Sequence, residues 1–386
     1  MHKVLRELKA DERLFFEQAL KFAVDKIEQN LPVFTELFPA SASQDLVYPA
    51  IENTDWTASF WTGMVWLAYE WTGDSRYREA AEEQLDSFRR RVEERIAVDT
   101  HDLGFLYSLS AVAAHRITGN PAAREMALEA AGLLADRYFP EAGIIQAWGD
   151  LNDPAQRGRM IIDCLLNLPL LHWAAEETGD SALASIAHRH ARQSARYLVR
   201  PDHTSYHTYY MDAETGKPLY GNTHQGYADD SCWARGQAWG IYGFALAYAH
   251  TGDSSLLDAS RQLADYFLSK LPADGIVYWD LIFTDGDRQE KDSSAAAIAV
   301  CGLLELCRQL PAEDQGAAGY REAALEMLVI LAERYTTKEH PHSNGILLHG
   351  VYNKPRGWGI DECTLWGDYF YCEALMRVLG EWRRYW

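Results

Sequence analysis

Long apolar segments alternate along the chain with amphipathic segments. Segments 59–71 and 104–117 are apolar nearly all round, as is typical of helices that are buried on every side. From Tyr77 to Val92, apolar residues instead recur every three or four positions, with Glu, Arg and Gln between them. The pattern therefore predicts buried inner helices that alternate with outer helices exposed on one face.

A short turn recurs four times between an apolar segment and the amphipathic segment that follows it. In each copy a glycine can end one helix in the left-handed conformation, and the next residue, Asp or Asn, can cap the following helix. Pro121, directly after one of these caps, fits the first helical position. The turns are formed by Gly73 with Asp74, Gly119 with Asn120, Gly179 with Asp180, and Gly252 with Asp253.

Extended over the whole chain, the alternation gives six inner and six outer helices. Six helical hairpins predict an all-α fold, an (α/α)6 toroid or barrel, whose long outer-to-inner loops carry the functional site. No Pro-, Ser- or Gly-rich linker divides the chain, so we expect residues 1–386 to form a single domain. The inner helices are expected to begin near residues 57, 103, 161, 233, 293 and 364, and the outer helices near residues 12, 75, 121, 181, 254 and 319.

The chain is strongly acidic, with 36 Lys and Arg against 56 Asp and Glu and a formal net charge of -20. Because no basic run could follow a phosphate backbone, nucleic acid is not an expected partner. Residues 1–22 lack the apolar core of a signal peptide, and no run of about 18 apolar residues occurs elsewhere. We therefore expect a cytoplasmic protein without a membrane partner, and the sequence gives no indication of its oligomeric state.

Six cysteines occur without a C-x-x-C pair, and several lie inside apolar runs. We expect them to be reduced residues of the core. His207 and His224 lie in a polar loop without the spacing of metal ligands, and no Gly-rich phosphate loop is present. The sequence therefore predicts neither a metal nor a cofactor.

Polar residues of catalytic type collect just before or at the start of the inner helices. In a toroid these starts share one mouth, where unpaired backbone N–H groups favour a bound anion. Asp102 could be a catalytic carboxylate or only the N-cap of a helix, and both interpretations stay open. Asp163 lies between Ile162 and Leu165 in an apolar run, where a carboxylate is unfavourable unless it is paired or protonated. We therefore favour a functional role for Asp163.

Other side chains near these helix starts suit recognition of an acidic sugar. Trp56 and Trp148 lie in polar loops, where an aromatic face could stack on a sugar ring or simply pack. Arg235 could bind a carboxylate through its planar guanidinium, or pair with Asp229 or Asp230 at the surface. The sequence leaves these alternatives open.

Taken together, these segments closely resemble the unsaturated glucuronyl hydrolases of glycoside hydrolase family 88. The resemblance runs from about residue 50 to the C-terminus and weakens between residues 341 and 362. The matching blocks are NTDWTASFWTG (53–63), HDLGFLYSLSA (101–111), AGIIQAWG (142–149), IIDCLLNLPLL (161–171), TSYHTYY (204–210), THQGYADDSCWARGQAWGIYGFAL (223–246), VYWD (277–280), DSSAAAIAVCGLLE (292–305) and LWGDYFYCEAL (365–375).

The resemblance implies an (α/α)6 barrel that removes a 4,5-unsaturated uronate from the nonreducing end of oligosaccharides made by polysaccharide lyases, without a metal or organic cofactor. It also implies that Asp163 is the general acid/base and Asp102 its partner. The substrate would therefore be an unsaturated uronyl oligosaccharide. The sugar-binding positions implied by the match are Trp56, His101, Trp148, His207, Gly221, Thr223, Gln225, Arg235 and Trp239.

The implied chemistry begins at the conjugated double bond rather than at the anomeric carbon. Protonation at C4 by Asp163 and addition of water at C5 would give a hemiketal that collapses and releases the second sugar. Apolar neighbours and the charge of Asp102 are expected to raise the pKa of Asp163. We therefore expect activity to favour mildly acidic pH.

The identity of the second sugar stays open at this level. In the weakly matching segment, Lys354 and Arg356 could recognise a sulfate or carboxylate on that sugar, or could be ordinary solvated charges. An unsaturated rhamnogalacturonyl hydrolase acting on pectin fragments is the main alternative. A sugar epimerase on the same barrel and a helical scaffold without activity are weaker alternatives.

Overall fold

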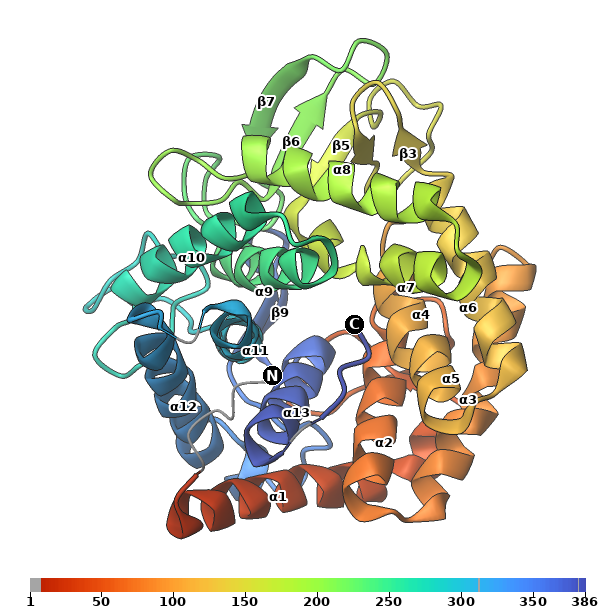
Figure 1. Ribbon diagram of the computed structural model, residues 1–386. Helices are drawn as coiled ribbons and strands as arrows, with labels where there is room; N and C mark the ends of the chain where they lie inside the picture. The colour runs from red at the N-terminus through yellow and green to blue at the C-terminus, as the bar shows by residue number, and fades with distance from the viewer. Residues whose placement is uncertain (1–7, 312, 381) are drawn as a thin grey trace.

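The computed structural model describes residues 8–386 apart from residues 312 and 381. Helices form an inner and an outer layer around a common axis, so that the molecule is a closed ring (Figure 1). Each predicted helix start lies within a few residues of an observed one. The predicted (α/α)6 barrel is therefore confirmed; part of the predicted non-signal N-terminus, residues 1–7, lies outside the described residues.

The inner layer consists of helices that are buried along most of their length, because their side chains are apolar on all sides. Two of them are interrupted near their starts, one by a π-helical turn and one by a 3-10 turn. The inner helices are α2 (Ala58–Thr72), α4 (Leu103–Tyr107) continued by η1 (Ser108–Val112) and α5 (Ala113–Thr118), η2 (Ile162–Leu166) followed by α7 (Pro169–Thr178), α9 (Ala234–Thr251), α11 (Ser293–Gln309) and α13 (Leu365–Leu379).

The outer layer consists of helices that face the inner layer on one side and solvent on the other. Their polar faces carry the charged residues that the sequence pattern placed there. The outer helices are α1 (Ala10–Phe34), α3 (Ser75–Glu93), α6 (Pro121–Ala135), α8 (Ser181–Tyr197), α10 (Ser254–Ser269) and α12 (Gly316–Arg334).

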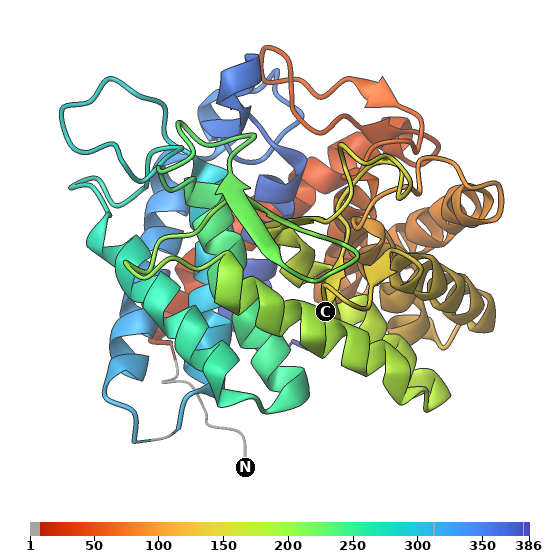
Figure 2. The ribbon, with the colours of Figure 1, turned by 90° about the horizontal axis from the view of Figure 1, so that it is seen from above.

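The four predicted turns join inner to outer helices as expected. Their glycines have φ between 68° and 77°, the left-handed conformation that ends a helix. The Asp or Asn that follows accepts a hydrogen bond from the first turn of the next helix. These turns lie at one end of the ring, so the longer outer-to-inner loops are free to build a site at the other end (Figure 2).

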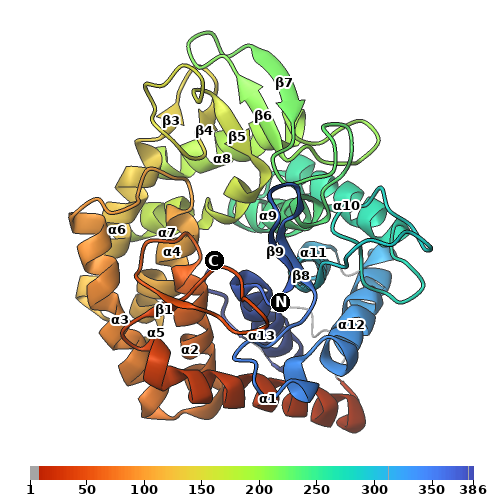
Figure 3. The same cartoon turned by 180° about the vertical axis from the view of Figure 1, so that it is seen from behind.

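Short strands within those longer loops were not predicted from the sequence. The three-stranded antiparallel sheet has the order β5-β6-β7, and β8 and β9 form a hairpin that packs against α11 (Figure 3). Two further strand pairs contain only two residues per strand. The strands are β1 (Phe38–Pro39), β2 (Ala50–Ile51), β3 (Tyr138–Phe139), β4 (Ile144–Ile145), β5 (Arg159–Ile161), β6 (Thr208–Met211), β7 (Pro218–Asn222), β8 (Gly350–Asn353) and β9 (Trp358–Glu362).

The opposite end of the barrel is closed by the last residues of the chain. The C-terminus lies inside the ring (Figure 1), and Trp386 is buried with its ring stacked on Phe370 at 6.0 Å. Its Nε1 donates a hydrogen bond to Glu373 at 2.8 Å. The six cysteines are buried and form no disulfide among the described residues, which confirms the expectation that they belong to the core.

Candidate active site

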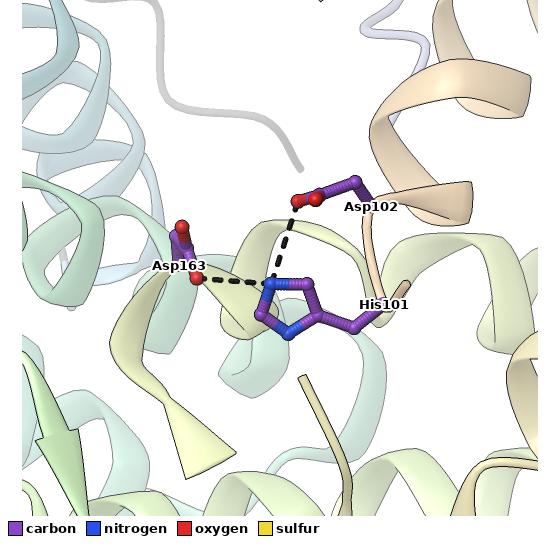
Figure 4. A group of neighbouring side chains, drawn as sticks. All are labelled: His101, Asp102 and Asp163. Atoms are coloured by element: carbon purple, nitrogen blue, oxygen red, sulfur yellow. Dashed lines mark ion pairs between the residues drawn. The ribbon is translucent and has the colours of Figure 1, made fainter. Parts of the chain in front are cut away.

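Three ionisable side chains from two neighbouring inner helices meet at the loop end of the barrel (Figure 4). Nε2 of His101 lies 3.4 Å from Oδ1 of Asp102 and 3.3 Å from Oδ1 of Asp163. The histidine side chain is 1% exposed, whereas the two carboxylates are 15% and 16% exposed. One imidazole therefore links both predicted catalytic carboxylates and leaves both within reach of a ligand.

A close contact between the two helix starts holds these carboxylates together. A Cβ atom on Gly104 would lie 2.2 Å from the Cα of Asn167, so that only glycine fits at this crossing. Asn167 then accepts a hydrogen bond from the backbone N–H of Phe105 at 2.6 Å. Its side-chain amide donates to the carbonyl oxygen of Asp163 at 3.3 Å. The segment after Asp102 is thus fastened to the turn that carries Asp163.

Asp102 occupies the N-cap position of α4 but does not cap the helix through its side chain. Its carboxylate instead accepts a hydrogen bond from Oγ1 of Thr100 at 2.6 Å and faces His101. Of the two interpretations left open by the sequence, the capping one is therefore wrong. The side chain is oriented toward the shared cluster.

Asp163 lies in the 3-10 turn η2, immediately before the helical part of its inner segment. Ile162 and Leu165 beside it are completely or almost completely buried, as expected. Its Oδ1 is buried without a hydrogen-bond partner among the described residues, and the contact with His101 is an ion pair at 3.3 Å. This oxygen therefore faces His101 and not solvent.

The pKa values of the two carboxylates differ from what the sequence led us to expect. Burial raises the pKa of Asp163, but the positive charge of His101 outweighs burial and brings this pKa below its ordinary value. Burial also raises the pKa of Asp102, which stays raised despite His101. The expectation that the pKa of Asp163 is raised in the free protein is therefore wrong, because a buried cation lies between the two carboxylates.

His101 is held in its protonated form by the same arrangement. Burial lowers the pKa of its imidazole, but the negative charges of Asp102 and Asp163 bring this pKa well above its ordinary value. The donor atoms of the three residues lie within 4.8 Å of one another, a spacing that metal ligands also have. A metal would require the imidazole to lose its proton first. The absence of a metal therefore stays a prediction.

The predicted aromatic residues line the wall beside this cluster. Trp56 is partly exposed, stacks on Trp366 at 5.2 Å and donates a hydrogen bond from Nε1 to the hydroxyl of Tyr352 at 3.0 Å. Trp148 is also partly exposed and meets the ring of His224 edge to face at 5.6 Å. Both indoles therefore retain exposed surface on which a sugar could stack.

Arg235 is fully enclosed and has internal partners for its guanidinium. It lies 3.6 Å from Asp292 and donates a hydrogen bond to Gln225 at 2.5 Å. The alternative pairing with Asp229 or Asp230 is therefore wrong. Burial lowers the pKa of Arg235, and the charge of Asp292 opposes this effect. In the absence of ligand, Arg235 orients Gln225 rather than presenting a free guanidinium.

The remaining predicted residues shape the site in different ways. His207 is buried, its Nε2 lies 3.4 Å from the side-chain nitrogen of Gln225, and burial lowers its pKa to about 3. Thr223 accepts a hydrogen bond from the backbone of Gly226 at 2.7 Å and so fixes the loop. Gly221 lies on β7, where a Cβ atom would come 2.6 Å from the ring of Tyr206. His207 directly precedes β6, Gly221 lies on β7 and Thr223 follows β7, so all three lie at one end of this strand pair.

Trp239 lies deeper in the barrel than the other predicted residues. It is 1% exposed and packs between Phe105 and Phe370 at centroid distances of 5.4 and 5.3 Å. Its contact with a sugar stays a prediction, and its position favours support of the site floor.

Comparisons with known proteins agree with this geometry. The model of Glycosyl Hydrolase Family 88 matches residues 38–315. An unsaturated chondroitin disaccharide hydrolase from Streptococcus pneumoniae is 47% identical over 96% of this chain and 93% of its own length. The chain belongs to glycosyl hydrolase family 88. As a member of this family it is a glycoside hydrolase.

Solved structures of family 88 proteins have the same fold. The crystal structure of unsaturated glucuronyl hydrolase from Streptococcus agalactiae has a TM-score of 0.95 and 44% identity, with 99% of this chain and 95% of that chain covered. A variant of the S. agalactiae protein complexed with dGlcA-GalNAc6S has a TM-score of 0.87 and 41% identity, with 100% and 99% covered. These similarities do not favour the pectin-directed or epimerase alternatives.

Two residues of this family 88 enzyme were missed as contributors to the site. The carbonyl oxygen of Tyr352 accepts a hydrogen bond from Arg235 at 2.7 Å, in addition to the contact between its hydroxyl and Trp56. Arg159 lies with its guanidinium carbon 4.7 Å from the ring centroid of Trp148. Tyr352 follows no sequence motif, and Arg159 would have required the position of strand β5. The sequence pattern therefore indicated neither residue.

Lys354 and Arg356, which could recognise the second sugar or be ordinary solvated charges, both lie in the β8–β9 hairpin. Lys354 forms an ion pair with Glu290 and is therefore not a free solvated charge. Arg356 is exposed, with its guanidinium carbon 5.0 Å from the ring centroid of Trp358. No helix of the described residues is long and apolar enough to cross a membrane.

Proposed function

We propose that this family 88 enzyme hydrolyses 4,5-unsaturated uronic acid residues from the nonreducing end of oligosaccharides, as a single catalytic domain. The observation that carries the proposal is the pair of reachable carboxylates, Asp102 and Asp163, on one buried imidazole. The relatives named as unsaturated glucuronyl and chondroitin disaccharide hydrolases support this substrate class. The cysteines are buried and form no disulfide among the described residues, which supports action in the reducing cytoplasm.

In the proposed reaction, Asp163 transfers a proton to C4 of the substrate double bond. The positive charge that develops at C5 is stabilised by the ring oxygen, and water adds at C5 while the Asp163 carboxylate takes one of its protons. The resulting hemiketal opens and releases the second sugar and an open-chain keto acid. Asp163 ends the cycle protonated, so that one carboxyl group suffices as acid and base.

The proton arrangement of the free cluster supplies this donor. His101 keeps Asp163 ionised before substrate binds, because its positive charge lowers the pKa of Asp163, and His101 itself retains a proton because its pKa is raised well above the ordinary value. A bound uronate adds a negative charge and excludes water, and both effects raise the pKa of Asp163. A proton can then move within the cluster to the oxygen that faces the double bond.

The wall residues provide binding rather than proton transfer. Trp56 and Trp148 offer aromatic surface for sugar rings, and Gln225, oriented by Arg235, offers an amide to a hydroxyl or carboxylate oxygen. The start of α9 lies at the same end of the barrel and favours a bound anion. An acidic protein can in this way retain an acidic substrate.

The test uses lyase-generated unsaturated disaccharides and follows loss of the ultraviolet absorbance of the conjugated double bond. The substrates are chondroitin, hyaluronan, heparin and pectin-derived disaccharides, and the variants are Asp163→Asn and, as a control, the exposed Asp150→Asn. We expect rapid loss with the wild type and Asp150→Asn, and none with Asp163→Asn. No loss on any glucuronyl disaccharide with a folded wild-type protein would contradict the proposal, and loss on pectin fragments alone would identify the alternative.

A further inference from the structure

A second cavity lies beside the β8–β9 hairpin, separate from the catalytic cluster. Its volume is about 550 Å³, and none of His101, Asp102 and Asp163 lines it. Its walls are formed by loop residues between 274 and 291, by the end of α12 with Tyr335, and by the base of the hairpin. Ligand pockets typically have volumes of roughly 300 to 1,000 Å³, so the space suits a small saccharide.

The acidic side chains that line this cavity already have basic partners. These pairs do not involve every basic residue of the cavity. They are Asp274 with Lys291 at 2.8 Å, Asp361 with His349 at 2.6 Å, and Glu290 with Lys354.

Two arginines remain on the walls without such a partner. Arg288 and Arg334 are exposed, and within residues 8–386 as described neither forms an ion pair or a side-chain hydrogen bond. In a chain of net charge -20, a basic group that faces an open cavity would ordinarily find a carboxylate nearby. Two unpaired guanidiniums at one cavity instead favour an anion with several oxygens, such as a carboxylate or sulfate.

We propose that this cavity is a second, non-catalytic site for an acidic sugar, whose carboxylate or sulfate lies between Arg288 and Arg334. The saccharide class rests on the proposed function, since an enzyme for uronyl oligosaccharides works among acidic sugars. Tyr335, 8% exposed, lines the same space and packs edge to face against His349 at 5.5 Å, so it forms a buried part of the wall.

The cavity shares the β8–β9 hairpin with the active site. His349, which lines the cavity, directly precedes β8, while the carbonyl oxygens of Val351 and Tyr352 accept hydrogen bonds from Arg235. His349 and its partner Asp361 both have left-handed φ, 62° and 60°, at the base of the hairpin. A saccharide in the cavity therefore contacts the same element that holds Arg235 in the catalytic wall.

The test measures binding of non-cleavable ligands to the full chain by titration calorimetry. The probes are the saturated disaccharide of glucuronate and 6-sulfated N-acetylgalactosamine, its unsulfated counterpart, and sodium sulfate. The variant is Arg288→Gln with Arg334→Gln. A matched control, Arg308→Gln with Arg383→Gln, removes two exposed arginines that do not line the cavity.

Besides any binding in the active site, we expect a binding event at the cavity that is weakened roughly tenfold or more by loss of the two cavity arginines and is unchanged in the control. Binding of both disaccharides identifies the carboxylate as sufficient, whereas binding of only the sulfated one identifies the sulfate. Equal binding by variant and wild type would overturn the proposal. Arginine-dependent binding of sodium sulfate as tight as that of the disaccharides would also overturn it, because the sugar would then contribute nothing.

A kinetic measurement separates this site from the catalytic one. The double variant should cleave a short unsaturated disaccharide with unchanged kcat, and a large loss of kcat would show that the cavity belongs to the catalytic site and so contradict the proposal. If the wild type cleaves no unsaturated disaccharide but retains arginine-dependent binding, the proposed function fails while the second site stands.

Discussion

Two buried clusters of charge lie at opposite ends of the barrel and differ in how completely they are paired. At the closed end, Arg377 donates to Glu373 at 2.8 Å and to Glu305 at 2.9 Å, and Arg384 lies 3.3 Å from Glu305. Trp386 supplies a further hydrogen bond to Glu373. At the open end, His101 alone serves two carboxylates.

The pKa directions follow this difference. Burial raises the pKa of Glu305, but Arg384 and Arg377 outweigh burial and bring it to about 2, so this carboxylate stays ionised. At the open end, the pKa of Asp102 stays raised and Asp163 leaves one oxygen without a hydrogen bond. The comparison teaches that charge burial alone does not mark a catalytic site, and that incomplete pairing of two partly exposed carboxylates is the feature on which the proposed site rests.

The largest expected effect is on activity at the open cluster. Replacing Asp163 with Asn removes the proton donor without changing its size, so we expect kcat to fall by roughly 10²–10⁴-fold. The melting temperature should also fall, by less than the activity does, because the lowered pKa of Asp163 means that His101 stabilises its charge in the folded protein. Steady-state kinetics and thermal unfolding of the same preparation check both statements, and a normal kcat would exclude Asp163 as the donor.

At the closed cluster we expect the opposite result, namely a large loss of stability and little loss of activity. Arg377→Met leaves Glu373 and part of Glu305 without their cation, and breaking a buried pair in this way typically lowers the free energy of unfolding by about 3–5 kcal/mol. Denaturant unfolding measures the loss, with the exposed Arg308→Met as control. The folded fraction should keep its kcat; a stable but inactive Arg377→Met variant would contradict the comparison.

A smaller effect is expected in the pH dependence. The pKa of His101 is raised well above its ordinary value, so the cluster keeps a proton through neutral pH and loses it as pH rises through that pKa. In His101→Asn only the two carboxylates can hold the catalytic proton. The alkaline limb of the pH profile of kcat/KM should therefore move to lower pH by about one unit or more. A limb at the same pH in wild type and variant would show that His101 does not hold the catalytic proton.

The smallest effect is expected at the wall of the open site. Tyr352→Phe removes the hydroxyl that accepts a hydrogen bond from Trp56, while the backbone carbonyl that serves Arg235 remains. Loss of one such hydrogen bond corresponds to about 1 kcal/mol, so KM should rise severalfold with kcat nearly unchanged. A fall in kcat with unchanged KM would instead place Tyr352 in the chemical step.

The helices and a functional role for Asp163 could be predicted because they follow from local pattern, whereas that pattern left Asp102 open between a catalytic and a capping role. The 3.6-residue period and the Gly-Asp turns specify the ring, and Asp163 is conspicuous within an apolar run. The sheet β5-β6-β7 could not be predicted, since its strands contain three to five residues and carry little periodicity. The expected rise in the pKa of Asp163 was wrong because, in the sequence, His101 is adjacent to Asp102 but not to Asp163.

The partner of Arg235 shows the same limit. Sequence proximity suggested Asp229 or Asp230, yet the ion pair is made with Asp292, from the start of the next inner helix. Ring closure brings together residues that are separated by tens of positions, and only tertiary packing decides which of them meet.

The contact between Gly104 and Asn167 also limits how this chain can vary over evolutionary time. A single methyl group at residue 104 would push apart the two segments that carry Asp102 and Asp163, even though residue 104 contacts neither carboxylate. Single substitutions in the outer-to-inner loops can change ligand recognition gradually. At residue 104, by contrast, even the smallest substitution would disturb the packing of the two segments. We therefore expect lineages to diversify in ligand preference around an almost invariant pair of carboxylates.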